Sequence, residues 1–204
     1  MKQREDIRQK IIKSATNLFQ KKGVHKVTMD DIAHTLSMSK RTLYQIFSDK
    51  EELLLACVIV FEQEDRKYAE ELKRKATSVL DFLLIYFSRK LSCMDDVVSE
   101  FYIDMIKYPR VAKHIELHKK MFESYAVNFL NKGVEEGFFR SDINLYIIVN
   151  QLRVGMDIAA QKNMLSQFSR RELFMNTVIP YIRGCSTIKG IDMIDEFIAK
   201  QIKK

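Results

Sequence analysis

Basic and polar side chains gather on a short stretch near the N-terminal end of the sequence, at positions suited to binding an anion. Lys40 and Arg41 follow Ser39, a residue type that often begins a helix, and Lys50 lies at a second expected helix start. Cations in the first turn of a helix oppose its dipole, at a cost of about 0.3–1 kcal/mol each. Beside free backbone N–H groups they instead form a strong site for an anion such as a nucleic-acid phosphate. Further hydroxyl and amide donors lie on the same stretch: Thr28, Thr42, Tyr44 and Gln45.

Three short helices in the first 47 residues must position these side chains. Residues 4–21 repeat apolar side chains at spacings of three and four, which predicts an amphipathic helix. Thr28 and Asp31 form a capping-box pattern that opens a second helix, and Ser39 caps a third. A tight turn between the second and third helices indicates a helix-turn-helix, which places its third helix in the DNA major groove. A basic cluster alone is more often a solvated surface, but the helix spacing and the caps favour the anion site.

The remainder of the sequence also predicts helices, so we expect an all-α fold of about nine to ten helices. Six Gly and two Pro among 204 residues argue against a β-rich chain with many turns. A capping pattern at Ser48–Glu51 predicts a long helix over 49–75, Ser141/Asp142 predict the start of a helix that runs to about 163, and Ser169–Glu172 predict the start of another. The other expected helices cover 77–91, 95–107, 110–136, 170 towards Gly184 with a kink at Pro180, and 191–202.

Composition excludes several classes of protein. The net charge is +7, and most of the excess falls in the first quarter of the chain, which hints at an anionic partner. The three cysteines are widely spaced and fit neither a disulfide framework nor a zinc ribbon. The N-terminus has no apolar signal region, and the longest apolar run, Leu53–Phe61, is about half a membrane span. We therefore expect a soluble, cytoplasmic protein with no membrane partner.

Residues 7–53 resemble the DNA-binding domain of the TetR family of transcriptional regulators. The matching features are Ala15 with Leu18-Phe19 and Gly23, Thr28 with Ile32-Ala33, Ser39-Lys40, Leu43-Tyr44 with Phe47, and Lys50-Glu51 with Leu53. Residues 136–142 weakly resemble the family's link into its eighth helix. The resemblance implies a helix-turn-helix domain over 1–50, with the helix-turn-helix itself at about 28–47. A helical ligand-binding and dimerisation domain over 51–204 would follow, with 49–75 as the connecting helix.

The resemblance also implies roles for individual residues of the N-terminal domain. Thr28, Tyr44 and Lys50 fall where family members contact phosphate. The positions at which the family reads bases or phosphates hold Lys40, Arg41, Thr42 and Gln45, with Ser39 as the helix cap before them. Ser37 departs from the family pattern, which has Gly in the turn, and a positive φ there costs about 1 kcal/mol. Arg41 stands where a small residue is common and could add a guanine or a phosphate contact, so the operator sequence stays open.

The expected C-terminal domain carries aromatic and methionine side chains that suit a pocket for an apolar or amphiphilic small molecule. For any single residue, a place in the core is the more ordinary interpretation, and the sequence does not identify the ligand. The candidates for lining this pocket are Phe82, Tyr86, Phe101, Tyr102, Met105, His118, Met121, Phe122 and Tyr125.

Residues 145–160 are apolar on nearly every side of the expected helix, so every side must be covered. The core of one protomer can cover one face, and a partner helix can cover another, although a helix buried wholly within a monomer is the alternative. We expect a homodimer, which also suits a helix-turn-helix that binds two half-sites of a palindromic operator. The candidate interface residues are Ile147, Gln151, Val154, Ile158, Met175, Ile179 and Ile182.

The sequence predicts no cofactor, metal site or catalytic centre. His114 and His118 have a spacing that can bind a metal, but Glu116 points away from their face and no thiolate lies near. Phosphate-cradling loops and the nucleophile motif G-x-S-x-G are absent from the sequence. We therefore expect a homodimeric repressor that a small molecule releases from double-stranded operator DNA. The alternatives are an all-helical small-molecule enzyme with an incidental basic N-terminus and an architectural DNA-binding protein without inducer.

Overall fold

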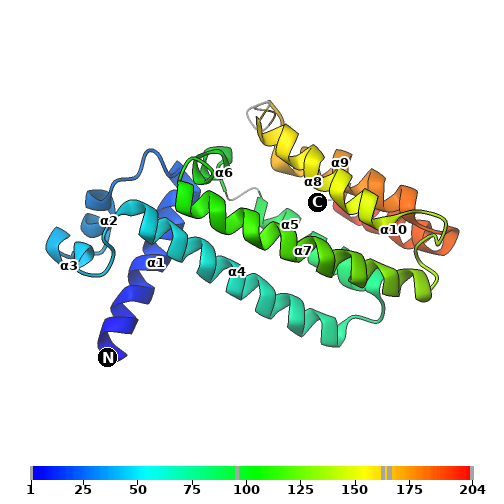
Figure 1. Cartoon of the computed structure of the whole chain (residues 1–204), viewed down its shortest axis with the longest axis horizontal. Coiled ribbons are helices and arrows are strands. Elements are labelled where there is room, and N and C mark those ends of the chain that lie inside the picture. The colour runs from blue at the N-terminus through cyan, green and yellow to red at the C-terminus, as the bar shows by residue number, and fades with distance from the viewer. Residues whose placement is uncertain (1, 95–96, 162–163, 165–166, 203–204) are drawn as a thin grey trace. The chain divides into compact units, whose positions relative to one another are not determined.

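The computed structural model describes residues 2–94, 97–161, 164 and 167–202, and these form an all-α fold (Figure 1). The helices are α1 (Lys2–Lys22), α2 (Met29–Thr35), α3 (Lys40–Tyr44), α4 (Lys50–Lys75), α5 (Val79–Met94), α6 (Ser99–Met105), α7 (Pro109–Glu135), α8 (Leu145–Gln161), α9 (Arg170–Cys185) and α10 (Ile188–Ile202). The prediction of about nine to ten helices is confirmed for this part of the chain. The contacts divide the chain into two compact units, Met1–Lys67 with Asp96–Leu117, and Tyr68–Asp95 with His118–Lys204.

The first unit has a core made by the apolar faces of α1, α2, α3 and the first half of α4. Figure 1 shows α2 and α3 beside one another, next to α1. The residues of this core that are most fully buried are Ile11, Ile12, Phe19, Val24, Ile32, Leu43, Phe47, Leu53 and Leu54. Helix α6 packs on α1, and Phe101 and Val111 complete the same core. The expected amphipathic faces of the N-terminal helices are therefore buried together.

Local hydrogen bonds fix the ends of α2 and α3. The Asp31 backbone N–H donates to the Thr28 hydroxyl at 3.1 Å, and the Thr28 N–H donates back to the Asp31 carboxylate at 2.8 Å. The Thr42 N–H donates to the Ser39 hydroxyl at 3.1 Å, so both predicted caps are present. Ser37, in the turn between them, has φ of 50°. This left-handed conformation is the strain that the sequence predicted for a non-glycine residue here.

Two predicted helix caps are wrong, by one residue at α4 and by two or three residues at α8. At α4 the Glu52 N–H donates to Asp49 rather than to Ser48, and Ser48 donates to the Glu52 carboxylate rather than to Glu51. The cap of α8 is Asn144, whose side-chain oxygen accepts from the backbone N–H groups of the next turn, instead of Ser141 or Asp142. In both places a second acceptor lies a few residues along the chain, and local sequence does not decide between them.

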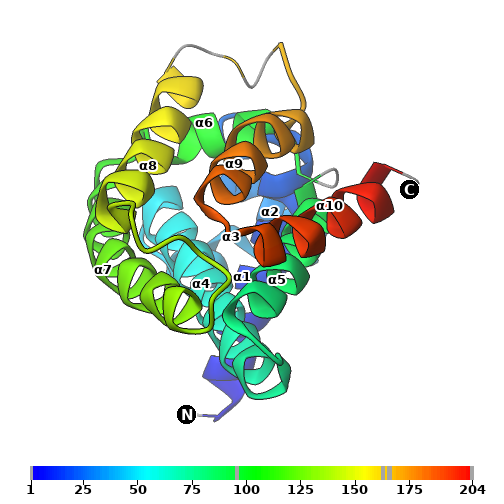
Figure 2. The same cartoon turned by 90° about the vertical axis from the view of Figure 1, so that its right-hand side faces the viewer.

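The second unit packs α5, the later part of α7, and α8 to α10 around an apolar core. Figure 2 shows α8 and α9 side by side, with α10 beyond α9. The buried residues of this core include Leu80, Leu91, Phe129, Phe139, Phe174, Val178, Ile179, Ile194 and Phe197. Pro180 lies within α9, as expected, and the Ser169–Glu172 capping box opens that helix. Among the described residues, none of the helices is both long enough and apolar enough to span a membrane.

Candidate nucleic-acid interface

Helix α3 presents a polar face to solvent because a single apolar side chain anchors it. Leu43 is fully buried, whereas Lys40, Arg41 and Gln45 are exposed and the Tyr44 ring is 48% exposed. Arg41 and Gln45 are four residues apart, so their side chains lie on the same side of the helix. A guanidinium and an amide on one exposed side can donate to successive base edges.

Three of the predicted contact residues also hold the helix ends. The Ser39 hydroxyl caps α3 and lies 2.8 Å from the Thr42 hydroxyl. The Thr28 hydroxyl donates to the Asp31 carboxylate at 2.7 Å, and this bond is the largest cause of the lowered pKa of Asp31. Thr28, Ser39 and Thr42 therefore have a structural role, whether or not they also reach a phosphate.

Lys40 joins α3 to α2 through an ion pair with Asp30. The hydrogen bond from the ammonium to that carboxylate, with the attraction between the charges, raises the pKa of Lys40. Both side chains are more than half exposed, and exposed ion pairs of this kind contribute little to stability. A phosphate can therefore replace Asp30 as the partner of Lys40 with little loss of stability.

Lys50 is half-buried and bonded within the protein. Its Nζ atom donates to the carbonyl oxygens of Val24 and Val27 at 3.0 Å each and lies 5.8 Å from the centre of the Tyr108 ring. An ammonium has three N–H donors, so two of them are already used here. The first turn of α4 thereby holds the loop that leads into α2, a structural role that the sequence did not indicate.

The same loop is held from its other side by α6, through residues that sequence reasoning missed. Asp104 is 5% exposed, and its carboxylate accepts from the His25 backbone N–H at 2.7 Å and from the Lys107 ammonium at 2.9 Å. Burial raises the pKa of Asp104, but these two hydrogen bonds and the nearby charges of Lys107 and His25 together outweigh it, so the pKa is lowered. Gly23 has φ of 83°, and a Cβ atom there would lie 3.0 Å from the Glu100 Cβ. The partners are about 80 residues apart in sequence, so no local pattern points to them.

The nine predicted pocket residues divide between the two units. Phe101, Tyr102 and Met105 belong to the first, where the Phe101 and Tyr102 rings pack edge to face at 5.1 Å as part of its core. Phe101 is buried in this core, and Tyr102 and Met105 pack against it half-buried, so all three have a structural role; whether they also contact a ligand stays a prediction.

The other predicted pocket residues lie in the second unit, and only some of them are together. Phe82 stacks on Tyr86 at 5.7 Å and meets Phe129 edge to face at 4.9 Å, while Tyr125 stacks on Phe129 at 6.2 Å. Met121 is 68% exposed, and His118 lies half-buried on α7. The side chain of Phe122 lies outside the described part of the structure. A surface depression lined by residues of 127–146 includes none of the nine.

Helix α8 is apolar on two sides, of which its own protomer buries one. Ile147, Val154 and Ile158 are 53%, 41% and 47% exposed, and Gln151 is exposed between them. Of the α9 candidates, Met175 and Ile182 are half-buried, packed against the protomer's own core.

Ile179 corrects the predicted set, because it is 3% exposed and belongs to the core of its own protomer. It has no surface left to offer a partner. Helical spacing alone placed it beside Met175 and Ile182, but α5, α8 and α10 of the same protomer all pack against α9.

Comparisons with known proteins agree with this geometry. Residues 11–57 match the family described as bacterial regulatory proteins, tetR family. The HTH-type transcriptional repressor KstR2 of Mycobacterium tuberculosis is 23% identical over 151 residues, which cover 72% of this chain and 76% of KstR2. A TetR-family transcriptional regulator from Agrobacterium tumefaciens has the same fold, with a TM-score of 0.73 at 15% identity over 90% of this chain and all of that one. A regulator from Saccharomonospora viridis, solved in complex with choline, has a TM-score of 0.63 at 16% identity over 84% of this chain and 96% of that one.

Proposed function

We propose that this chain is a DNA-binding regulator of the tetR family, a homodimeric repressor released from its operator by a small apolar or amphiphilic molecule. The family match at residues 11–57 and the relatives, which are transcriptional regulators, support a DNA-binding regulator rather than an enzyme. The observation that carries the proposal is the exposed polar side of α3, held in place by buried Leu43 and by the Ser39 cap.

In the proposed complex, α3 enters the major groove, where some of its residues contact bases and others contact phosphates. Arg41 and Gln45 read base edges, because their donors lie on one exposed side of the helix. The cation of Lys40 and the hydroxyl of Tyr44 bind phosphates, which fix the register of the protein on the duplex but carry no sequence information. Lys50 acts mainly by holding the loop before α2, with its remaining N–H as the candidate phosphate donor.

The exposed apolar side of α8 supports the dimer. Ile147, Val154 and Ile158 recur at intervals of seven and four residues, so they lie on one side of the helix, with the exposed Gln151 among them. Exposed apolar side chains gathered on one side of a helix suit an interaction site, and two copies of one such side can meet across a two-fold axis. A dimer also gives two copies of α3, which suits a palindromic operator.

The aromatic cluster of the second unit supports a sensor for an organic molecule. The rings of this cluster lie on α5 and α7, and the centres of neighbouring rings are 4.9–6.2 Å apart: Tyr86 with Phe82, Phe82 with Phe129, and Phe129 with Tyr125. Ring faces of this kind suit apolar or cationic ligands. The choline complex of the Saccharomonospora viridis regulator supports the idea that this fold can hold a small organic ligand. We take the cluster as the place where the inducer binds.

Binding-site selection from a random duplex library tests the reading of DNA. We expect the wild-type chain to select a palindrome. Arg41→Ala and Gln45→Ala should each lose about 1–3 kcal/mol of binding free energy on that palindrome and relax the base preference at one or two positions. Arg66→Ala, an exposed cation on α4, is the control and should keep the wild-type preference. The same preference in all four proteins would contradict base reading by α3.

A panel of small molecules then separates a ligand-responsive repressor from an architectural protein. Release of the selected duplex by an apolar or amphiphilic compound, and loss of that release in Tyr86→Ala, is the expected result. If the protein binds the palindrome but no compound releases it, the repressor proposal fails in favour of the architectural alternative.

A further inference from the structure

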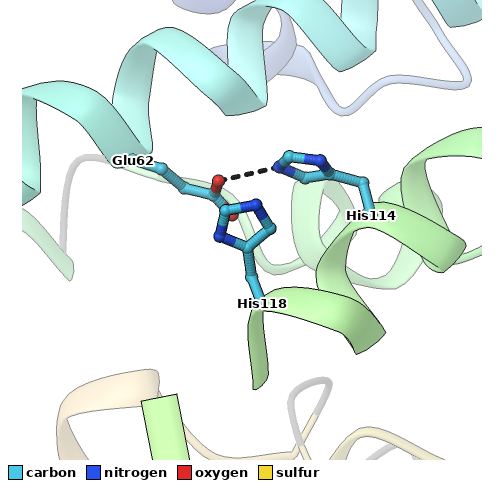
Figure 3. A group of neighbouring side chains, drawn as sticks. All are labelled: Glu62, His114 and His118. Atoms are coloured by element: carbon cyan, nitrogen blue, oxygen red, sulfur yellow. Dashed lines mark hydrogen bonds and ion pairs between the residues drawn. The ribbon is translucent and has the colours of Figure 1, made fainter. Parts of the chain in front are cut away.

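Two histidines and a glutamate converge on one point, on the facing sides of α4 and α7. Figure 3 shows Glu62 of α4 opposite His114 and His118, which lie one turn apart on α7. The Nε2 atom of His114 lies 2.8 Å from the Glu62 carboxylate, and the three side chains bring a ligand atom each to within 4.8 Å of one another. We propose that these three residues bind a divalent transition-metal ion, with Zn²⁺ as the expected occupant.

The chemistry of the three donors selects the class of ion. Two imidazole nitrogens with one carboxylate oxygen suit Zn²⁺ and its neighbours in the first transition row, whereas Ca²⁺ and Mg²⁺ prefer oxygen donors alone. Three protein ligands with a fourth position left for water or an anion are a common zinc arrangement. Bonds of about 2.0–2.2 Å to a tetrahedral ion place ligand atoms somewhat over 3 Å apart. Small side-chain rotations therefore suffice to close the present group around an ion.

The backbone already holds the donors in place. The four-residue spacing puts His114 and His118 on the same side of α7, so the helix itself sets their separation. The start of α7 is also joined to the start of α4: Arg110 donates to Asp49, the residue before α4, at 2.6 Å and pairs with Glu51 at 3.1 Å. The side chains of His114 and Glu62 are 19% and 29% exposed, so an ion can enter but most of its surroundings are protein.

A histidine–carboxylate hydrogen bond alone is the simpler interpretation of the group. Such a pair needs one imidazole, and Glu62 with His114 already completes it. His118 brings a second imidazole to the same point in Figure 3, so the group holds the three donors of a metal site and not only the two of a pair. A single such ion would connect α4 to α7 by direct bonds.

The position of the site on α4 gives the ion a regulatory consequence, which rests on the proposed function. Glu62 lies twelve residues after Lys50, about 18 Å along the helix from the turn that holds the loop before α2. An ion that ties α4 to α7 favours one position of α4, and so one position of the DNA-reading helices. By linkage, DNA and metal must then alter each other's affinity by the same factor.

Titration of tag-free protein with Co²⁺ tests the site without reference to DNA. We expect a single ion per chain, with the visible absorption of a nitrogen- and oxygen-coordinated site, and competition by Zn²⁺. Glu62→Gln and His118→Asn should each weaken binding at least about tenfold. The matched controls are Glu64→Gln, an exposed residue of the same helix, and His34→Asn, an exposed histidine of α2, and both should bind as the wild type does.

The wild-type titration keeps the proposal falsifiable even where a variant fails to fold. Absence of Co²⁺ and Zn²⁺ binding by the folded wild-type chain overturns the site, and so does wild-type affinity in both ligand variants. DNA affinity measured with and without Zn²⁺ tests the regulatory consequence separately. Equal DNA affinities with and without Zn²⁺ overturn the regulatory consequence but not the metal site. If the chain binds the metal but does not bind DNA, only the proposed function is overturned.

Discussion

Helices α3 and α8 both expose side chains to solvent, but of opposite character. On α3 the exposed groups are cations, an amide and a phenol, whereas on α8 most of them are apolar: Ile147, Val154 and Ile158, with Tyr146 and Gln151 beside them. Short-range hydrogen bonds from Ser39 and Thr28 fix α3 and its neighbour α2, whereas apolar packing on α9 holds α8. The difference indicates two kinds of partner: α3 suits a polyanion, and α8 suits a second apolar helix surface.

The largest effect is expected from a charge on the exposed side of α8. Ile158→Glu should dissociate the dimer, because a carboxylate without a partner would be buried there twice, once per protomer. At about 3–5 kcal/mol for each uncompensated buried charge, the dimer dissociation constant should rise at least about a thousandfold. Sedimentation equilibrium measures the change, with Ile106→Glu, an exposed apolar residue of the first unit, as the control. Equal dimerisation in the two variants would remove α8 from the interface.

A contrast between two lysines sharpens the account of the DNA-reading region. Lys50→Met removes two hydrogen bonds from an ammonium to backbone carbonyls, so we expect it to lower the free energy of unfolding by about 2–3 kcal/mol. Lys40→Ala should leave the unfolding midpoint unchanged but flatten the salt dependence of DNA binding by about one unit of slope. Urea unfolding and fluorescence anisotropy at several salt concentrations measure these effects. If the effects of the two variants were reversed, the roles assigned here would be wrong.

Two glycines test whether the loop before α2 requires its left-handed residue. Gly23→Ala should cost about 1–2 kcal/mol, because φ is 83° there and the new Cβ would press on Glu100. Gly184→Ala lies within α9 with open space around the new Cβ, so it should stabilise the protein by up to about 1 kcal/mol. Thermal unfolding of both variants is the measurement. A Gly23 variant as stable as the wild type would show that the loop can relax.

The smallest expected effect is on the pH dependence of stability, through Asp104, the buried carboxylate of α6. The pKa of Asp104 is lowered in the folded protein from its ordinary value of 3.8, so the unfolded chain takes up protons first as the pH falls. The stabilisation from Asp104 is therefore complete above that ordinary value and is lost as the pH drops through the folded value. We expect the free energy of unfolding to decline less steeply between about pH 5 and pH 3 in Asp104→Asn than in the wild type. Parallel declines would show that Asp104 does not contribute.

Local chemistry explains which parts of the fold could be predicted. The boxes at Thr28–Asp31 and Ser169–Glu172 each use residues three apart, so the sequence displays them directly. At α8, by contrast, Asp142 forms an ion pair with Arg140 at 2.6 Å. Asn144 caps the helix in its place. Such competition depends on side-chain geometry that a residue pattern does not contain.

Long-range packing explains which site residues the sequence could not supply. Helical spacing identified the apolar sides of α8 and α9 but could not tell that Ile179 faces its own core. In the same way, His114 and His118 were visible as a pair, but Glu62 lies 52 residues before His114 and reaches it only because α4 packs against α7. Asp104 was missed for the same reason. Contacts between helices that are distant in sequence can be assigned only once the fold is known.

The central claim is that α3 reads a specific DNA sequence, and competition binding tests it most directly. Fluorescence anisotropy would compare the selected palindrome with a scrambled duplex of equal length and composition at about physiological salt. The account predicts that the wild-type chain binds the palindrome at least about a thousandfold more tightly, and that Arg41→Ala loses much of this preference. Equal affinity for the two duplexes would contradict the claim.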